Sequence, residues 1–120
     1  MASDLVDRPN PEFEGGSAQP LTVTIGADDD HTVVLTLAGE VDLATIEILR
    51  ACLEQASSGA WSSVVVDLEG VSFFDSTGLA TIAAANRSLS DAGRAFGLRR
   101  PTDAVQRVLV VTGMGDLILD

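Results

Sequence analysis

The segment at residues 63–68, which reads Ser-Val-Val-Val-Asp-Leu, constrains the fold more than any other part of the chain. It is almost continuously apolar and β-branched, and this pattern predicts a β-strand. A strand with one face in water would alternate apolar and polar residues, whereas this segment presents apolar side chains to both faces. We therefore expect it to be the central strand of a sheet, covered on both sides.

Periodic patterns around this strand predict an alternation of strands and helices. We expect strands at residues 21–25, 32–38, 63–68, 95–99 and 117–119, with the turn at 26–31 joining the first two as a hairpin. We expect helices after Asp42 as N-cap, over 79–92, and after Thr102 as N-cap. The β-branched run at 108–111 also suits a strand, but the Pro-Thr-Asp before it and Gly113 after it favour the helix.

This order of elements indicates an α/β fold in which a hairpin is followed by crossover connections. We expect a four- to five-stranded mixed sheet with helices packed mainly on one face. The chain has 120 residues, which suits one domain. Residues 1–20 hold three of the four prolines and few large apolar side chains. They predict a disordered acidic leader, followed by a domain over 21–120.

Charge excludes some classes of partner. The formal net charge is −11 and lysine is absent, whereas nucleic acids and anionic membranes both require clustered cations. Residues 21–70 carry nine acidic residues against one arginine, so surfaces built there favour a cationic partner. No apolar run approaches the length of a membrane span, no signal peptide is visible, and the single cysteine, Cys52, suits a reducing compartment. We therefore expect a cytoplasmic location.

Two short motifs carry most of the functional information. Residues 74–79, Phe-Asp-Ser-Thr-Gly-Leu, join an apolar strand end directly to a helix. Ser76 and Thr77 are expected at the N-terminus of that helix, where backbone N–H groups lack intrahelical partners and the dipole is positive. The simplest interpretation is that one of them caps the helix. The second motif, Gly-Glu-Val-Asp at residues 39–42, follows the second expected strand.

Taken together, these motifs resemble the STAS family, specifically the bacterial anti-sigma factor antagonists, or anti-anti-sigma factors. The resemblance runs from about Leu21 to Asp120, and residues 64–68 are similar to the family's central strand. In that family, a partner that is both kinase and anti-sigma factor phosphorylates the first hydroxyl residue after the aspartate, which here is Ser76. The unphosphorylated antagonist binds the anti-sigma factor and frees the sigma factor. Phosphorylation abolishes this binding, and a phosphatase restores it.

The resemblance implies a binding module that regulates transcription, in stress responses for example, without enzymatic activity, cofactor or metal. It implies that Ser76 is the phosphorylation site. The residues that it implies for partner binding are Gly39, Glu40, Asp42, Asp75, Thr77, Gly78 and Leu79. A phosphate adds about 1.5–2 negative charges, and a helix N-terminus accommodates negative charge. We therefore expect a repulsive and steric switch rather than a refolding switch.

The main alternative is a related module that senses a ligand or redox state, or acts as a scaffold, without phosphorylation. Cys52 is the candidate for a redox response. Enzyme classes have less support, because His31, the only histidine, lies beside the aspartates at 28–30 and no serine hydrolase elbow is present. The spacing from Asp75 to Gly78 is one residue too long for an aspartic protease, and the strands argue against an acyl carrier protein. Residues 28–30 lack the spacing of an EF-hand, and the chain has no Walker loop.

Overall fold

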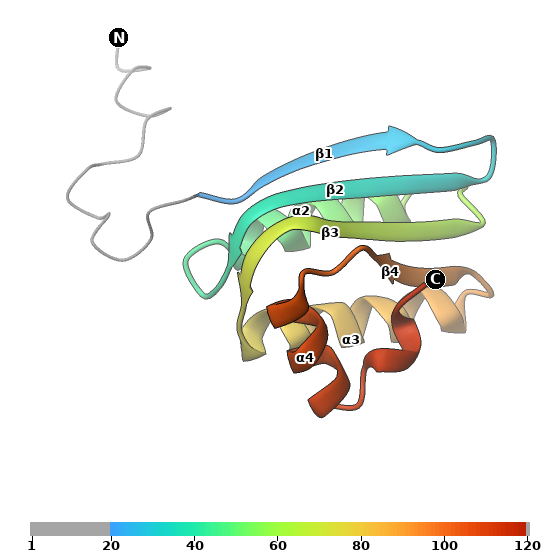
Figure 1. The fold of residues 1–120 in the computed structure, drawn as a ribbon. Coiled ribbons are helices and arrows are strands. Elements are labelled where there is room, and N and C mark those ends of the chain that lie inside the picture. Colours follow the sequence, from blue (N-terminus) through green and yellow to red (C-terminus); the bar gives the residue numbers. More distant parts are fainter. Residues whose placement is uncertain (1–19, 120) are drawn as a thin grey trace, which may run out of the picture.

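The expected central strand is the longest strand of the structure, a computed structural model that describes residues 20–119 (Figure 1). β3 (Ser63–Phe74) pairs in parallel with β2 (Thr32–Val41) on one side and with β4 (Ala95–Arg99) on the other. β1 (Thr22–Ala27) pairs antiparallel with β2, which gives the sheet order β1-β2-β3-β4. The predicted mixed sheet is confirmed, with four strands. The predicted leader, apart from Pro20, lies outside the described residues.

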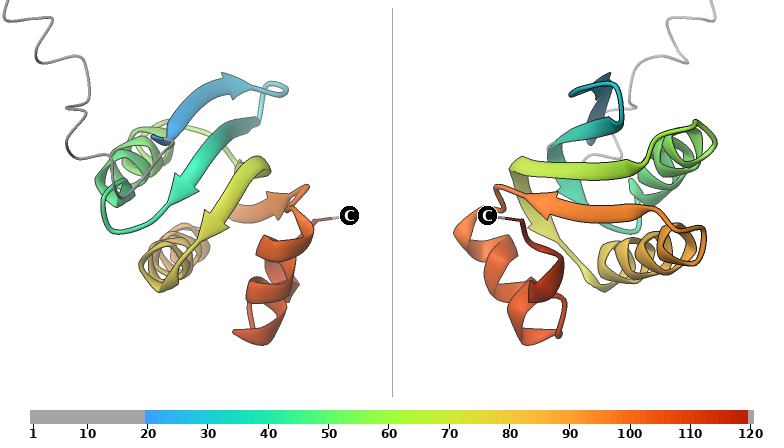
Figure 2. Two further views of the ribbon diagram at one scale, coloured as in Figure 1. Left: turned by 60° about the vertical axis from the view of Figure 1, so that its left-hand side comes forward. Right: turned by 90° about the vertical axis from the view of Figure 1, so that its right-hand side faces the viewer.

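Within residues 20–119, three α-helices cover this sheet. α2 (Ile46–Ser57) and α3 (Ser76–Asp91) lie together on one face, and α4 (Asp103–Val111) lies on the other side (Figure 2). The prediction of helices mainly on one face is therefore confirmed, as is the helix after Thr102, whose hydroxyl accepts a hydrogen bond from the Val105 N–H. No helix within residues 20–119 combines the length and apolar character needed to cross a lipid bilayer.

The core forms where α2 and α3 pack against the sheet. On α2 the apolar residues spaced along one helical face are buried, at Ile46, Leu49, Leu53 and Ala56. Alternate residues of β2 and β3 meet these helices, and they include Val33, Leu35, Leu37, Val64, Val66 and Leu68. Burial of these apolar side chains is the main favourable contribution to folding. The core also fixes which face of each strand points inward.

The prediction that Asp42 is the N-cap of the first helix is wrong. β2 continues through Val41, and the Asp42 carboxylate instead accepts hydrogen bonds from the N–H groups of Ala44 (3.0 Å) and Thr45 (3.2 Å). These bonds close an Asx-type turn, and the helix begins three residues later than expected, at Ile46. Both interpretations rest on the same property of aspartate, which is to accept bonds from backbone N–H groups just ahead of it in the chain.

The expected strand at 117–119 does not form. Gly115–Leu117 is a 3-10 helix, in which the N–H groups of Leu117 and Ile118 donate to Met114 and Gly115. These two donors are therefore unavailable to a sheet ladder. Only the Leu119 N–H reaches β4, where it donates to Leu98 O at 2.7 Å. The segment makes a single isolated bridge, and the sheet stays at four strands.

A buried carboxylate joins β3 to the end of β4. The Asp67 side chain is 1% exposed and bonds the Arg99 Nε at 3.1 Å and the Arg100 Nη2 at 2.5 Å. Arg100 has a φ of 54°, a backbone conformation that residues with a side chain rarely adopt. Burial would raise the pKa of Asp67, but hydrogen bonds from Arg100, the Glu69 N–H and Arg99 outweigh it and hold the pKa below its ordinary value.

Replacing Asp67 with Asn should destabilise the fold, because two arginines would lose their buried counter-charge. We expect the free energy of unfolding at pH 7 to fall by about 2 kcal/mol, less than for a fully buried pair because both arginines reach solvent. The lowered pKa means that this stabilisation is complete above about pH 5 and is lost as the pH falls through the folded pKa. Urea denaturation between pH 3 and pH 7 measures both effects, with the exposed Asp30→Asn as control. Equal stability of Asp67→Asn and wild type at pH 7 would contradict the account.

Candidate functional site

The two sequence motifs meet at one edge of the sheet, where the parallel strands β2 and β3 end. Glu40 pairs with Phe73, and Val41 pairs with Phe74. Beyond the last pair, the Asp75 N–H donates to Val41 O at 3.1 Å. The turn at residues 42–45 and the first turn of α3 therefore lie at the same end of the molecule (Figure 1). We call residues 40–45 and 73–77 the strand-end surface.

Asp75, not Ser76 or Thr77, caps α3. Its Oδ1 accepts hydrogen bonds from the N–H groups of Thr77 (2.9 Å) and Gly78 (3.1 Å). Ser76 lies at the N-terminus of the helix as expected, but the helix begins at Ser76 itself rather than at Leu79, and the residue is exposed. The interpretation of Ser76 or Thr77 as a cap is therefore wrong. Because Asp75 provides the cap, the Ser76 hydroxyl makes no hydrogen bond with any other residue in 20–119.

The turn between β2 and α2 is stabilised by hydrogen bonds of the buried Thr45 side chain. The Thr45 side chain is almost fully buried, and its hydroxyl donates to Glu40 O at 2.9 Å. The same hydroxyl accepts from the Asp42 N–H at 3.0 Å. Leu43, at the tip of this turn, is 76% exposed and takes no part in the core. The turn therefore presents an apolar side chain on a well-ordered backbone.

Two of the predicted contact residues are buried glycines that shape this edge. Gly39 has a φ of 119° and lies against the Pro20 carbonyl, so a side chain there would be strained and would have no space. At Gly78 a Cβ atom would overlap the Phe74 ring and lie 2.7 Å from a Val41 methyl. Glycine thus lets α3 approach the strand ends closely. Leu79 is partly buried and packs against the core.

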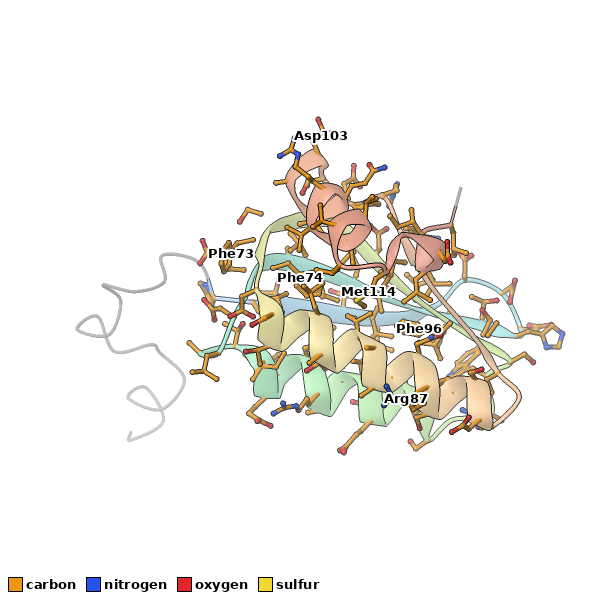
Figure 3. The ribbon with its side chains drawn as sticks, turned by 90° about the horizontal axis from the view of Figure 1, so that it is seen from below. Phe73, Phe74, Arg87, Phe96, Asp103 and Met114 are labelled. Carbon is orange, nitrogen blue, oxygen red and sulfur yellow. The ribbon has the colours of Figure 1, made fainter. Side chains whose placement is uncertain are left out.

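The sequence prediction missed two exposed apolar residues of the strand-end surface, Leu43 and Phe73. Phe73 is 48% exposed, whereas its neighbour Phe74 is 4% exposed. Figure 3 shows Phe74 inside the molecule and Phe73 at its margin. Adjacent residues of a strand point to opposite faces, so the Phe-Phe pair could have signalled that one ring lies outside. The exposure of Leu43 was harder to predict, because it follows from the start of α2 at Ile46, which leaves Leu43 in the turn before the helix.

The electrostatics of the strand-end surface are acidic. Asp42 and Asp75 bond backbone N–H groups, and neither is in an ion pair within residues 20–119, where the paired arginines are Arg50, Arg99 and Arg100. Arg50 is bound to Glu47 on α2 at 2.5 Å. The positive end of the α3 dipole partly offsets the Asp75 charge. The surface therefore favours a cationic ligand and disfavours further negative charge.

Outside the strand-end surface, a small-molecule or metal site in the described part of the chain would require a suitable groove or a suitable grouping of side chains. A groove of about 600 Å³ lies between α2 and α3, and its lining includes Arg50, Leu53, Glu54, Ala80, Thr81 and Ala84. Residues 20–119 contain no group of three histidine, cysteine or acidic side chains arranged to hold a metal ion. Cys52 is a free thiol, partly buried against the core.

Comparison with known proteins agrees with this geometry. The family described as "Mlab, STAS domain" matches residues 26–120. An anti-sigma F factor antagonist of Lysinibacillus sphaericus is 34% identical over 92 residues, which cover 75% of this chain and 78% of the relative. The anti-sigma factor antagonist SpoIIAA in its unphosphorylated form superposes with a TM-score of 0.72 at 28% identity, covering 82% of this chain and 87% of that one. The phosphorylated form of the Bacillus cell fate determinant SpoIIAA superposes with a TM-score of 0.67 at 27% identity, covering 82% and 90%.

Gly78 offers a direct test of the close packing at this edge. In an open helix, a change from glycine to alanine stabilises by about 1 kcal/mol. At Gly78 we expect the opposite sign, with a loss of about 1–3 kcal/mol, because the added methyl group would collide with Phe74 and Val41. Thermal or urea denaturation of Gly78→Ala measures this. Gly26→Ala is the control, since nothing lies within 4 Å of a Cβ atom there. A stabilised Gly78→Ala would refute the close contact.

Proposed function

The chain belongs to the STAS-domain family of anti-sigma factor antagonists, and from this premise we propose that it binds an anti-sigma factor through the strand-end surface and is switched off by phosphorylation of Ser76. Members of this family are regulators rather than enzymes. In the proposed cycle the unphosphorylated chain occupies the anti-sigma factor, and the sigma factor is released. The anti-sigma factor is itself the serine kinase, and a phosphatase regenerates the active form.

The observation that carries this proposal is the position of Ser76. Its hydroxyl is exposed on the first turn of α3, and Asp75 has taken over the capping of that turn. A phosphoryl group can therefore be transferred to Ser76 without breaking a hydrogen bond that holds the helix. Among the other predicted contact residues, Asp75, Thr77 and Leu79 lie close to Ser76 in the chain, and Glu40 and Asp42 lie at the end of the paired strand β2. Gly39 and Gly78 set the backbone that carries them.

The same geometry supports a switch that acts through charge and shape. The Thr77 and Gly78 N–H groups already bond the Asp75 carboxylate, so they are not available to bind a phosphate on Ser76. A phosphate of about 1.5–2 negative charges would stay in solvent beside Asp75. A partner docked over Ser76 would have to desolvate that charge next to a carboxylate. The similarity of this chain to SpoIIAA in both its unphosphorylated and its phosphorylated form fits a switch without refolding.

Substitution of Ser76 tests the switch. We expect Ser76→Ala to bind the anti-sigma factor within a few-fold of wild type, because the hydroxyl is not needed for the fold. Ser76→Asp should bind about 100-fold more weakly, which corresponds to a penalty of about 2.7 kcal/mol. Isothermal titration calorimetry with the purified anti-sigma factors of the source organism measures both affinities and identifies the partner.

Ser90→Asp is the matched control, since it adds the same charge to the exposed side of the same helix at its opposite end. It should bind like wild type. The melting temperature of Ser76→Asp should stay close to that of wild type, which separates a switch from unfolding. Equal affinities of Ser76→Ala and Ser76→Asp would refute the phosphorylation switch.

The alternative function, a module that senses a ligand or redox state without phosphorylation, has the groove between α2 and α3 and the thiol of Cys52 as its candidates. Phosphopeptide mapping from growing and stressed cells separates the two functions. Phosphate on Ser76 in at least one condition supports the switch. Its absence in every condition favours the sensor.

A further inference from the structure

We propose that Leu43 and Phe73 are the apolar anchors of the strand-end surface, and that the anti-sigma factor meets them with an apolar pocket bordered by basic side chains. This inference rests on the proposed function, because it names the residues through which that partner is recognised. It goes beyond the switch at Ser76, which determines whether the partner binds but supplies little contact area of its own.

Leu43 has no role in the fold that would explain its identity. Its side chain is 76% exposed, at the tip of the turn that Asp42 and Thr45 hold in place. The turn depends on the hydrogen bonds of those two residues and not on the leucine. Because hydrogen bonds already hold the backbone of this turn, little backbone freedom is lost when the leucine enters a pocket, and burial of its side chain contributes to affinity.

Phe73 stands beside this turn on the neighbouring strand. It pairs with Glu40, and the Glu40 carbonyl accepts the hydrogen bond of the Thr45 hydroxyl that holds the turn. Glu40 thus connects the two anchors, and both lie at the end of the sheet where β2 and β3 terminate. The Phe73 ring faces away from the core that holds Phe74, and it is 48% exposed at the margin of the molecule (Figure 3).

The acidic side chains next to Leu43 and Phe73 indicate which kind of partner surface would fit these two residues. Asp42 precedes Leu43 directly, and Asp75 lies two residues after Phe73, with Ser76 next to it. Neither carboxylate is in an ion pair within residues 20–119. Apolar anchors surrounded by charged groups are the usual arrangement of a protein–protein contact, with a hydrophobic centre and a polar rim. The complementary surface is an apolar pocket with lysine or arginine side chains at its border.

The test uses the anti-sigma factor that binds the wild-type chain in the titration above. We expect Leu43→Ala and Phe73→Ala each to weaken this binding by about tenfold, as for residues at the centre of an interface. The double variant should be weaker than either. Val111→Ala is the matched control, because Val111 is 78% exposed on α4 and lies outside the strand-end surface, and it should bind within twofold of wild type.

Circular dichroism melting shows that each variant is folded, and Leu43→Ala is the safer variant because its side chain is the more exposed. The failure of this inference can be distinguished from the failure of the proposed function. If Ser76→Asp weakens binding while Leu43→Ala and Phe73→Ala bind like wild type, the anchors are refuted and the switch stands. If the wild-type chain binds no anti-sigma factor, both are refuted.

Discussion

The parallel pairing of β2 with β3 is the constraint on which the rest of the structure depends. It aligns Val41 with Phe74, and the Asp75 N–H extends the pairing by one more bond to Val41 O. Two segments more than 30 residues apart in the sequence are thereby fixed side by side. The turn that presents Leu43 and the helix that begins with Ser76 both start from this edge. A shift of register by one residue would turn every side chain of the edge to the opposite face.

Most of the scaffold could be predicted from the sequence, because its signals are local. Val64 to Leu68 indicate a central strand, the spacing from Ile46 to Ala56 indicates a buried helix face, and Pro101 to Asp103 indicate a helix start. The structure confirms all three. Ser76 was likewise placed correctly at a helix N-terminus, because the change from an apolar strand to a helical pattern is visible around it.

The features that sequence reasoning misplaced or missed depend on which of two aspartates caps a helix, or on contacts between residues far apart in the chain. Asp42 and Asp75 each follow the last residue of a strand and accept hydrogen bonds from backbone N–H groups ahead of them, yet Asp75 caps α3 while Asp42 closes a turn. The carboxylate of Asp67 finds its arginines 32 and 33 residues further along the chain, a contact that no local pattern reveals. The exposure of Leu43 and Phe73 likewise follows from where the neighbouring elements end.

The proposed switch combines a rigid strand-end surface with one small chemical change, the phosphorylation of Ser76. The strand-end surface is fixed by backbone hydrogen bonds, by the Asp75 cap and by the close packing at Gly78. Under the proposed switch, a charge added at Ser76 therefore acts on the partner and leaves the fold intact. The most direct test compares amide chemical shifts and hydrogen exchange of the chain with and without phosphate on Ser76. We predict changes confined to residues 40–45 and 73–79, with protection in β3 and along α3 unchanged. Loss of protection in the central strand or along α3 would contradict the account, because the switch would then work by unfolding.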